Sequence, residues 1–166
     1  MDQMFDARTC SLLAPSGGSS VAISIRSVYE AESRIPEVAT VNAHKAPELL
    51  ATFNIAYLDI KDVLLKLSFL RIEAEKEANR RRAIVVLDEV PKILAAKGLG
   101  GGRSAGGSED QRNAILALDQ EYLVATDRVS CLKAMMELME GKLKGIEWAF
   151  TSVKNILGQD NGWRDL

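Results

Sequence analysis

Aromatic residues, cysteine, histidine and proline are all scarce in this sequence of 166 residues. Aromatic side chains make up only 5%, and the other apolar residues are mostly Leu, Ala, Ile, Val and Met, which form helices readily. Cys10 and Cys131 lie far apart, without a CxxC pair or a neighbouring histidine. This spacing excludes the common zinc motifs and a fold held by disulfides. We therefore expect a mainly α protein without a metal or a cofactor.

A basic leader and a long apolar run are also lacking. The first residues carry acids at Asp2 and Asp6, and no apolar run approaches the ~20 residues of a membrane helix. We expect a cytoplasmic protein with no membrane partner. Lys and Arg number 21 against 23 Asp and Glu, and the net charge is -2. A role with nucleic acid would therefore depend on a local basic patch.

The first 45 residues differ in their sequence pattern from the rest of the chain. Their PSGGSS segment is typical of flexible chain, and Val21, Ile23 and Ile25 then alternate with small or polar residues as in one short strand. No partner strand is evident nearby. We therefore expect residues 1–45 to form an N-terminal arm, flexible or docked on a neighbour, rather than a sheet. The single histidine, His44, lies in a linker and has no ligand companions.

A heptad pattern begins at Pro47 and predicts a long helix. We expect this helix to stop or kink near Asp88, because Pro91 has no backbone N–H to donate. A short helix over PKILAAK follows, capped by Asp88 and ended by Gly98. The predicted seam consists of Leu50, Phe53, Tyr57, Ile60, Leu64, Leu67, Arg71, Ala74 and Ala78.

The glycine-rich segment GLGGGRSAGG comes next, and its backbone freedom predicts a mobile loop. It lacks the Gly-Lys-Ser/Thr that closes a P-loop, and no clear strand leads into it, so we do not assign a nucleotide cradle.

The longest heptad pattern runs without a break from Ile115 through Leu118 and Tyr122 to Leu157, with entry residues at 108–110 and an exit at Gly158. Such a helix is too long for a compact globule of this mass. We predict an elongated antiparallel hairpin of two long helices with a short intervening helix. Residues 46–158 would form one helical domain, which holds the candidate oligomerisation and binding residues given below. Residues 159–166 would be a polar tail, in which Trp163 either frays or docks a partner.

Further apolar residues lie off the seam of the last helix and would stay uncovered in a pair of helices. Self-association into a homo-oligomer follows as a prediction. The methionines are interpreted as core packing rather than as a promiscuous peptide groove. The predicted oligomerisation residues are Met136, Met139, Leu143, Ile146, Trp148, Phe150 and Val153.

No catalytic arrangement of residues is recognisable, and we expect no enzymatic activity. The distinctive feature is a basic run at the end of the first long helix, which no acid follows until Asp88. These cations either complement the helix dipole or bind phosphates, and an oligomer would repeat them around the assembly. The predicted DNA-binding residues are Lys76, Arg80, Arg81 and Arg82, with Arg103 in the glycine-rich loop; Arg112, Lys142, Lys144 and Lys154 could extend the patch.

Three segments carry a resemblance to a known family: FLRIEAEKEANRRRAI at residues 69–84, LDQEYL, and EGKLKGIEWAFTSVKNI. Over residues 47–157 the chain resembles the T4-type phage recombination mediators, the UvsY family. The resemblance implies a ring-forming helical protein without catalysis. Such mediators bind single-stranded DNA and the single-strand-binding protein that coats it, and they load a RecA-like recombinase in the infected bacterial cell.

The family's DNA-contacting bases follow its LRIEA-like segment. The resemblance therefore implicates Arg81 most directly, with Lys76, Arg80 and Arg82 as neighbours, whereas one family basic position falls on Ala83. Two alternatives remain: a coiled-coil structural scaffold, and an adaptor whose exposed Met/Leu/Trp face captures partner helices. The acidic composition and the few aromatic residues near the arginines favour the scaffold, and neither alternative binds nucleic acid.

Overall fold

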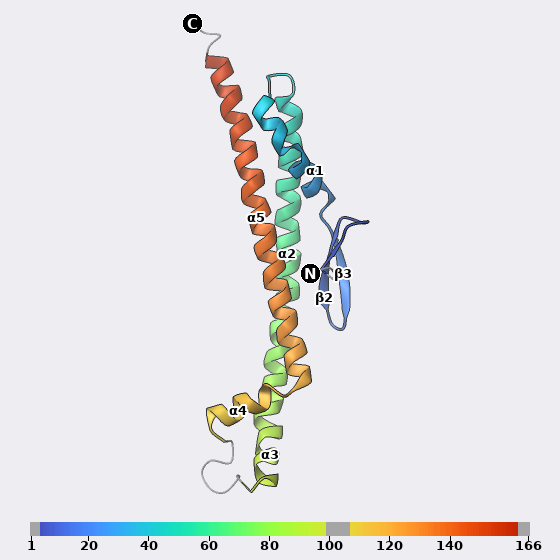
Figure 1. Cartoon of the computed structure of the whole chain (residues 1–166), viewed down its shortest axis with the longest axis vertical. Coiled ribbons are helices and arrows are strands. Elements are labelled where there is room, and N and C mark those ends of the chain that lie inside the picture. Colours follow the sequence, from blue (N-terminus) through green and yellow to red (C-terminus); the bar gives the residue numbers. More distant parts are fainter. Residues whose placement is uncertain (1–3, 99–106, 163–166) are drawn as a thin grey trace. The chain divides into compact units, whose positions relative to one another are not determined.

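The fold is mainly α, as predicted, in a computed structural model that describes residues 4–98 and 107–162, with side chains up to residue 158. Two long helices, α2 (Ala46–Ile84) and α5 (Gln120–Gly162), dominate it (Figure 1). Backbone contacts divide the chain into two units. Unit 1 comprises residues 1–68 and 134–166, and unit 2 comprises residues 69–133.

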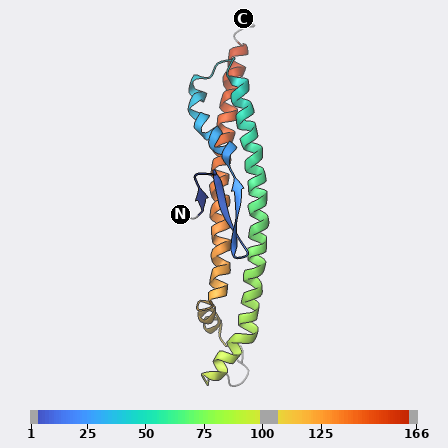
Figure 2. The ribbon, with the colours of Figure 1, turned by 90° about the vertical axis from the view of Figure 1, so that its right-hand side faces the viewer.

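The N-terminal segment forms a three-stranded antiparallel sheet, so the prediction of an arm with one short strand was wrong. The strands β1 (Phe5–Asp6), β2 (Ser11–Ser16) and β3 (Ser19–Ser24) pair in that order (Figure 2). Gly17 and Gly18 make the turn between β2 and β3 with positive φ angles of 48° and 91°, which glycine adopts without strain. The segment taken for flexible chain is therefore a hairpin turn. Its partner strand was missed because SLLAPS does not alternate and contains a proline.

A short helix, α1 (Arg26–Arg34), and a 3₁₀ turn (Ile35–Thr40) follow the sheet, in the N-terminal arm where no helix was predicted. Arg34 Nη1 lies 2.7 Å from Glu48 Oε1 of α2, and Lys142 Nζ of α5 lies 2.6 Å from Glu32 Oε2 of α1. The same ammonium lies 4.8 Å from the centre of the Tyr29 ring. These contacts hold α1 against both long helices within unit 1.

The core of unit 1 uses a seam of α2 that is rotated from the predicted one. Phe53, Ile60 and Leu67 are fully buried as expected, whereas Leu50, Tyr57 and Leu64 are only half-buried. In their place the structure buries Leu49, Ala56 and Val63. α1 contacts α2 beside this seam, where the Ser27 hydroxyl donates to Asp59 Oδ2 and Arg34 pairs with Glu48.

In unit 2 the helix does not stop near Asp88. A π-helical turn (Val85–Glu89) leads directly into α3 (Val90–Ala96), and the Val90 N–H donates to the Val85 carbonyl. The π turn accommodates Pro91, which cannot donate to an α-helical ladder. Asp88 lies inside this turn and is no cap, so that part of the prediction was wrong. Gly98, with a φ of 71°, confirms the predicted left-handed residue just after α3.

The last helical pattern is broken, contrary to the prediction. Ser108 caps a separate helix, α4 (Glu109–Leu116), through a capping box with Gln111. The chain then turns, and Asp119 Oδ1 accepts the Tyr122 N–H at 2.7 Å to begin α5. Leu118, predicted on the seam, is consequently 84% exposed.

The antiparallel pairing of the long helices is confirmed. In unit 2, ion pairs join Arg81 to Asp119 and Glu77 to Arg128. The later residue of α2 therefore pairs with the earlier residue of the α5 segment, as antiparallel helices require. Gly158 does not end α5, which continues to Gly162. Residues 99–106 of the glycine-rich segment and Trp163 lie outside the described residues.

Candidate nucleic-acid interface

The basic run of α2 does not form one patch, because successive residues point ~100° apart around a helix. Lys76 and Arg80 are exposed on the side of α2 opposite the buried Ala74 and Ala78. Arg81 and Arg82 lie on the two flanks. The structure therefore distributes these cations over different surroundings within unit 2.

Arg81 is held by carboxylates of its own unit. Its guanidinium donates to both oxygens of Asp119, lies 2.9 Å from Glu89 Oε1 and lies 3.2 Å from Glu121 Oε2. The hydrogen bond from Arg81 lowers the pKa of Asp119, and the bond from the Tyr122 N–H lowers it further. The carboxylates in turn raise the pKa of Arg81. Arg81 thus joins α2, the π turn and the start of α5.

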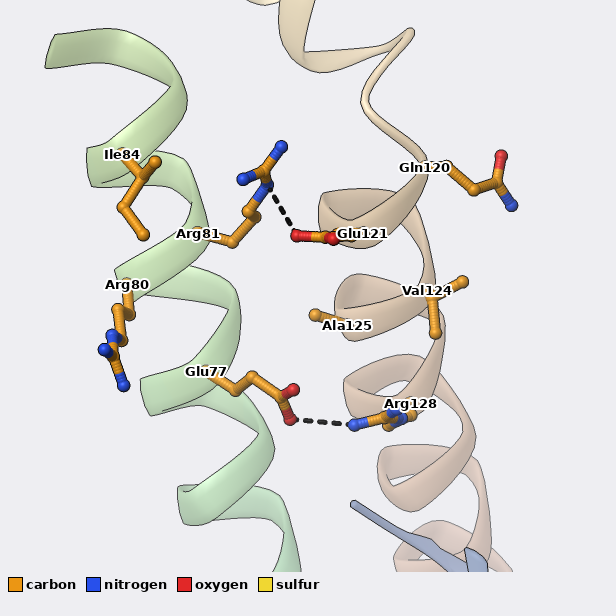
Figure 3. A pocket seen from close by; sticks show the side chains of 9 residues that line it. All are labelled: Glu77, Arg80, Arg81, Ile84, Gln120, Glu121, Val124, Ala125 and Arg128. Carbon is orange, nitrogen blue, oxygen red and sulfur yellow. Dashed lines mark hydrogen bonds and ion pairs between the residues drawn. The ribbon is translucent and has the colours of Figure 1, made fainter. Parts of the chain in front are cut away.

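Beside Arg81 lies a first cavity of about 370 Å³ between α2 and α5 (Figure 3). Arg128 Nη1 and Glu77 Oε2, 2.7 Å apart, neutralise each other on its wall. Arg80 belongs to the same wall, but its side chain is turned away from α5 in this view. The charges of the first cavity are therefore largely balanced internally, which disfavours it as an anion site.

Arg82 lines two other cavities of unit 2, of about 580 and 410 Å³, which we call the Arg82 cavities. Both have Asn79 and Arg82 in their walls. The larger is completed by Ala83, Val86, Leu87, Glu109, Arg112, Asn113 and Leu116, and the smaller by Glu75, Ala78, Tyr122, Thr126, Val129, Ser130 and Lys133.

The Arg82 cavities carry more positive than negative charge. Within the described chain, neither Arg82 nor Arg112 has a carboxylate within ion-pair distance, and Lys133 Nζ reaches Glu75 Oε1 only at 4.0 Å. Three cations thus face two carboxylates, Glu75 and Glu109. The first cavity has the same count of three cations and two carboxylates, but two of its cations are ion-paired. The unpaired Arg82 and Arg112 therefore suit a polyanion better than the first cavity does.

The predicted oligomerisation residues mostly lie inside unit 1. Met136 and Phe150 are half-buried, and Trp148 is 62% exposed. The pattern had selected the face of α5 that packs inside the chain. The residues fully or almost fully buried there are Met139, Leu143, Ile146 and Val153.

The sequence did not indicate that two further side chains, Tyr122 and Arg112, would line the Arg82 cavities. Tyr122 was counted only as a seam residue, yet its ring lies on the wall that Arg82 shares. Arg112 was one of several scattered bases, and the capped helix α4 brings it to the larger Arg82 cavity. The only early signal was the capping pattern at Ser108. Arg103 lies outside the described residues.

No set of three metal-ligating side chains occurs in the described parts of the chain. No helix among the same residues is long and apolar enough to cross a membrane. The chain matches no protein-family model, no curated protein and no solved structure.

Proposed function

We propose that this protein is a recombination mediator that binds single-stranded DNA and helps to load a RecA-like recombinase. The observation that carries the proposal is the pair of Arg82 cavities, where Arg82 and Arg112 have no carboxylate partner among the described residues. Arginine and lysine are the side chains that hold phosphates. The resemblance of residues 47–157 to the UvsY family points to the same segment of α2.

Single strands suit these cavities better than duplexes for a second reason. Tyr122 is half-buried, with its ring packed against the small apolar core of Val85, Val90, Leu94 and Leu116. A tyrosine ring anchored in this way offers a surface on which an unpaired base can stack, worth ~1–3 kcal/mol per base. Bases in a duplex are already stacked on each other and gain nothing from Tyr122.

We further propose that the chain works as a homo-oligomer, as the resemblance implies for a ring. Support comes from a second apolar stripe on α2, opposite the buried seam. Ile55, Leu58 and Leu65 are each more than half exposed there, and Phe69 and Ile72 take the next two positions of the same heptad repeat in unit 2. Heptad spacing is what a second helix requires of its partner. The interface therefore moves from the predicted face of α5 to α2.

The remaining roles come from the resemblance alone. They are contact with the single-strand-binding protein, loading of the recombinase, and action in the cytoplasm of a phage-infected bacterium. The scaffold and the adaptor remain the competing functions, and DNA binding separates them from the mediator.

The DNA proposal is tested by fluorescence anisotropy with a labelled oligothymidylate, with unlabelled single and double strands as competitors. Wild type should prefer single strands, with a steep salt dependence. The triple variant Lys76→Gln, Arg80→Gln and Arg82→Gln should bind more weakly. A matched triple of exposed cations elsewhere, Arg8→Gln, Arg26→Gln and Lys45→Gln, should not. Equal losses in both triples, or no binding by wild type, would favour the scaffold or the adaptor.

The oligomer proposal is tested by sedimentation velocity. Leu58→Glu and Leu65→Glu should each dissociate the assembly while the circular dichroism spectrum stays helical, because an unpaired carboxylate at an interface is costly. Ile146→Glu, inside unit 1, should instead reduce helicity itself. A wild-type protein that sediments as a monomer at all concentrations would rule out self-association.

A further inference from the structure

The larger Arg82 cavity brings together two arginines from separate helices. Arg82 comes from α2, and Arg112 comes from α4, which begins after the glycine-rich segment. Asn79 and Asn113 lie on the same wall and add amide donors. Unlike the arginines Arg81 and Arg128 of the first cavity, neither arginine here is ion-paired among the described residues.

The hydrogen-bonding capacity of Arg112 is not used within the described residues. Its Nε–H is buried and donates to no acceptor there. Glu109 lies three positions earlier on the same helix, a spacing at which ion pairs commonly form, yet the two groups form none. A buried donor without an acceptor carries a desolvation cost, and a rotation of the guanidinium that places this N–H on an oxygen in the cavity would remove that cost.

We propose that Arg82 and Arg112 together hold a single phosphate group, which we assign to the backbone phosphodiester of single-stranded nucleic acid. The proposal rests on the proposed function and adds α4 to the binding surface. Guanidinium groups bind phosphate oxygens through paired N–H donors, so two of them can hold one phosphate from two sides. Val86 and Leu87 on the same cavity then face the sugar or base, which needs no charged partner.

The two arginines should behave as one unit if they share a phosphate. We expect Arg82→Gln and Arg112→Gln each to weaken oligothymidylate binding by about 10-fold, and each to reduce the logarithmic salt slope by about 0.7. The double variant should lose less than the product of the two single losses, because the second arginine no longer has its phosphate to hold.

Three control variants sharpen this measurement. Lys133→Gln lies on the smaller Arg82 cavity, so its loss should multiply with that of Arg112→Gln. Glu109→Gln removes the one carboxylate that lines the larger cavity among the described residues, and it should strengthen binding. Arg8→Gln, on an exposed turn of unit 1, should leave binding unchanged. Multiplicative losses for Arg82 and Arg112, or an Arg112→Gln variant that binds as tightly as Arg8→Gln, would overturn the shared phosphate while leaving the proposed function intact.

A second ligand separates the sources of phosphate. Calorimetric titration with inorganic phosphate should give no saturable heat at concentrations where the oligonucleotide binds, because one isolated anion lacks the neighbouring contacts of a strand. An oligonucleotide with an uncharged methylphosphonate backbone should bind weakly. If wild type binds inorganic phosphate, Arg112→Gln abolishes that binding, and no oligonucleotide binds, then the site takes a free anion. That result would overturn both the nucleic-acid assignment and the proposed function.

Discussion

The two units use the same pair of helices but hold them together with different chemistry. In unit 1 the helices meet through large side chains, with Phe53, Leu67 and Ile146 fully buried. In unit 2 the corresponding positions of α2 are Ala74 and Ala78. Ion pairs from Arg81 and Arg128 to acids across the helix pair complement this smaller core.

The energetic consequence follows from the size of the buried groups. A fully buried Leu, Ile or Phe contributes about 1.5–3 kcal/mol, whereas a methyl-sized group contributes about 0.8 kcal/mol. Small seam residues also leave room for the cavities that Arg82 lines. Binding surfaces that must adapt to a ligand are commonly found where local stability is low. The proposed DNA site therefore lies in unit 2, the unit with fewer large buried side chains.

The largest effect is expected for Leu67→Ala, which should lower the free energy of unfolding by about 2–5 kcal/mol. Leu67 is fully buried in unit 1. The same substitution at Leu118, 84% exposed, should change it by less than about 0.5 kcal/mol. Denaturant titration measures both. Similar losses at the two positions would mean that α5 continues back through residue 118 as the heptad pattern suggested.

Gly107→Ala should destabilise unit 2 by at least about 1–2 kcal/mol, since Gly107 has a φ of 68°. An added Cβ would also lie 2.6 Å from Leu94 Cδ1 in the small core. Gly145→Ala is the control: this glycine is inside α5 with open space around it, so alanine should stabilise by about 0.5–1 kcal/mol. If both substitutions shift the thermal unfolding temperature in the same direction, that result would contradict the backbone geometry of Gly107 before α4.

Asp119→Ala should lose about 0.5–2 kcal/mol at neutral pH, because Asp119 caps α5. Its lowered pKa means that the ionised carboxylate stabilises the fold fully above its ordinary value of 3.8, and that this contribution disappears as the pH falls through the lower folded value. Asp119→Asn keeps the cap without the charge. Wild type and Asp119→Asn should therefore converge in stability only below about pH 4. A difference between them that grows on acidification would reverse the assigned sign.

The smallest effect is expected for the pair Glu77 and Arg128. A double-mutant cycle with Glu77→Gln and Arg128→Gln should give a coupling energy of about 0.2–1 kcal/mol, because Glu77 is half exposed. The coupling should shrink at high salt. In unit 1, Lys142 and Glu32 form a less exposed pair, and their coupling should be less sensitive to salt. A coupling energy that is more sensitive to salt for Lys142 with Glu32 than for Glu77 with Arg128 would contradict this contrast between the units.

The mainly α fold, the antiparallel pair and the glycine after α3 could be predicted, because each depends on local spacing or on one residue's backbone preference. The face of α2 that becomes buried could not. It depends on α1, whose residues lie close to α2 through long-range pairs such as Arg34 with Glu48. The break before α5 was also hidden. It contains neither proline nor glycine, and it rests on a side-chain cap at Asp119 that no periodicity reveals.

The basic run could be located from the sequence, but the partners of its members could not. Arg81 and Arg82 are adjacent in the chain, yet one faces three carboxylates and the other faces none within ion-pair distance among the described residues. Asp119 is 38 positions from Arg81, and Arg112 is similarly remote from Arg82. Counting charges along a helix identifies where cations gather. The fold decides which of these cations remain unpaired and can bind a ligand.

The division of the two helices also sets an order of folding. Contacts of unit 2 close short loops, 38 residues for Arg81 with Asp119 and 51 for Glu77 with Arg128, whereas Lys142 and Glu32 of unit 1 are 110 residues apart. Closing the longest of these loops costs about 1 kcal/mol more chain entropy than closing the shortest. Every residue of unit 2 has been synthesised by position 133, before the part of α5 that completes unit 1. On the ribosome, the proposed DNA-binding unit is therefore the first that can close, and the later, larger core then joins to a chain whose helix direction is already set.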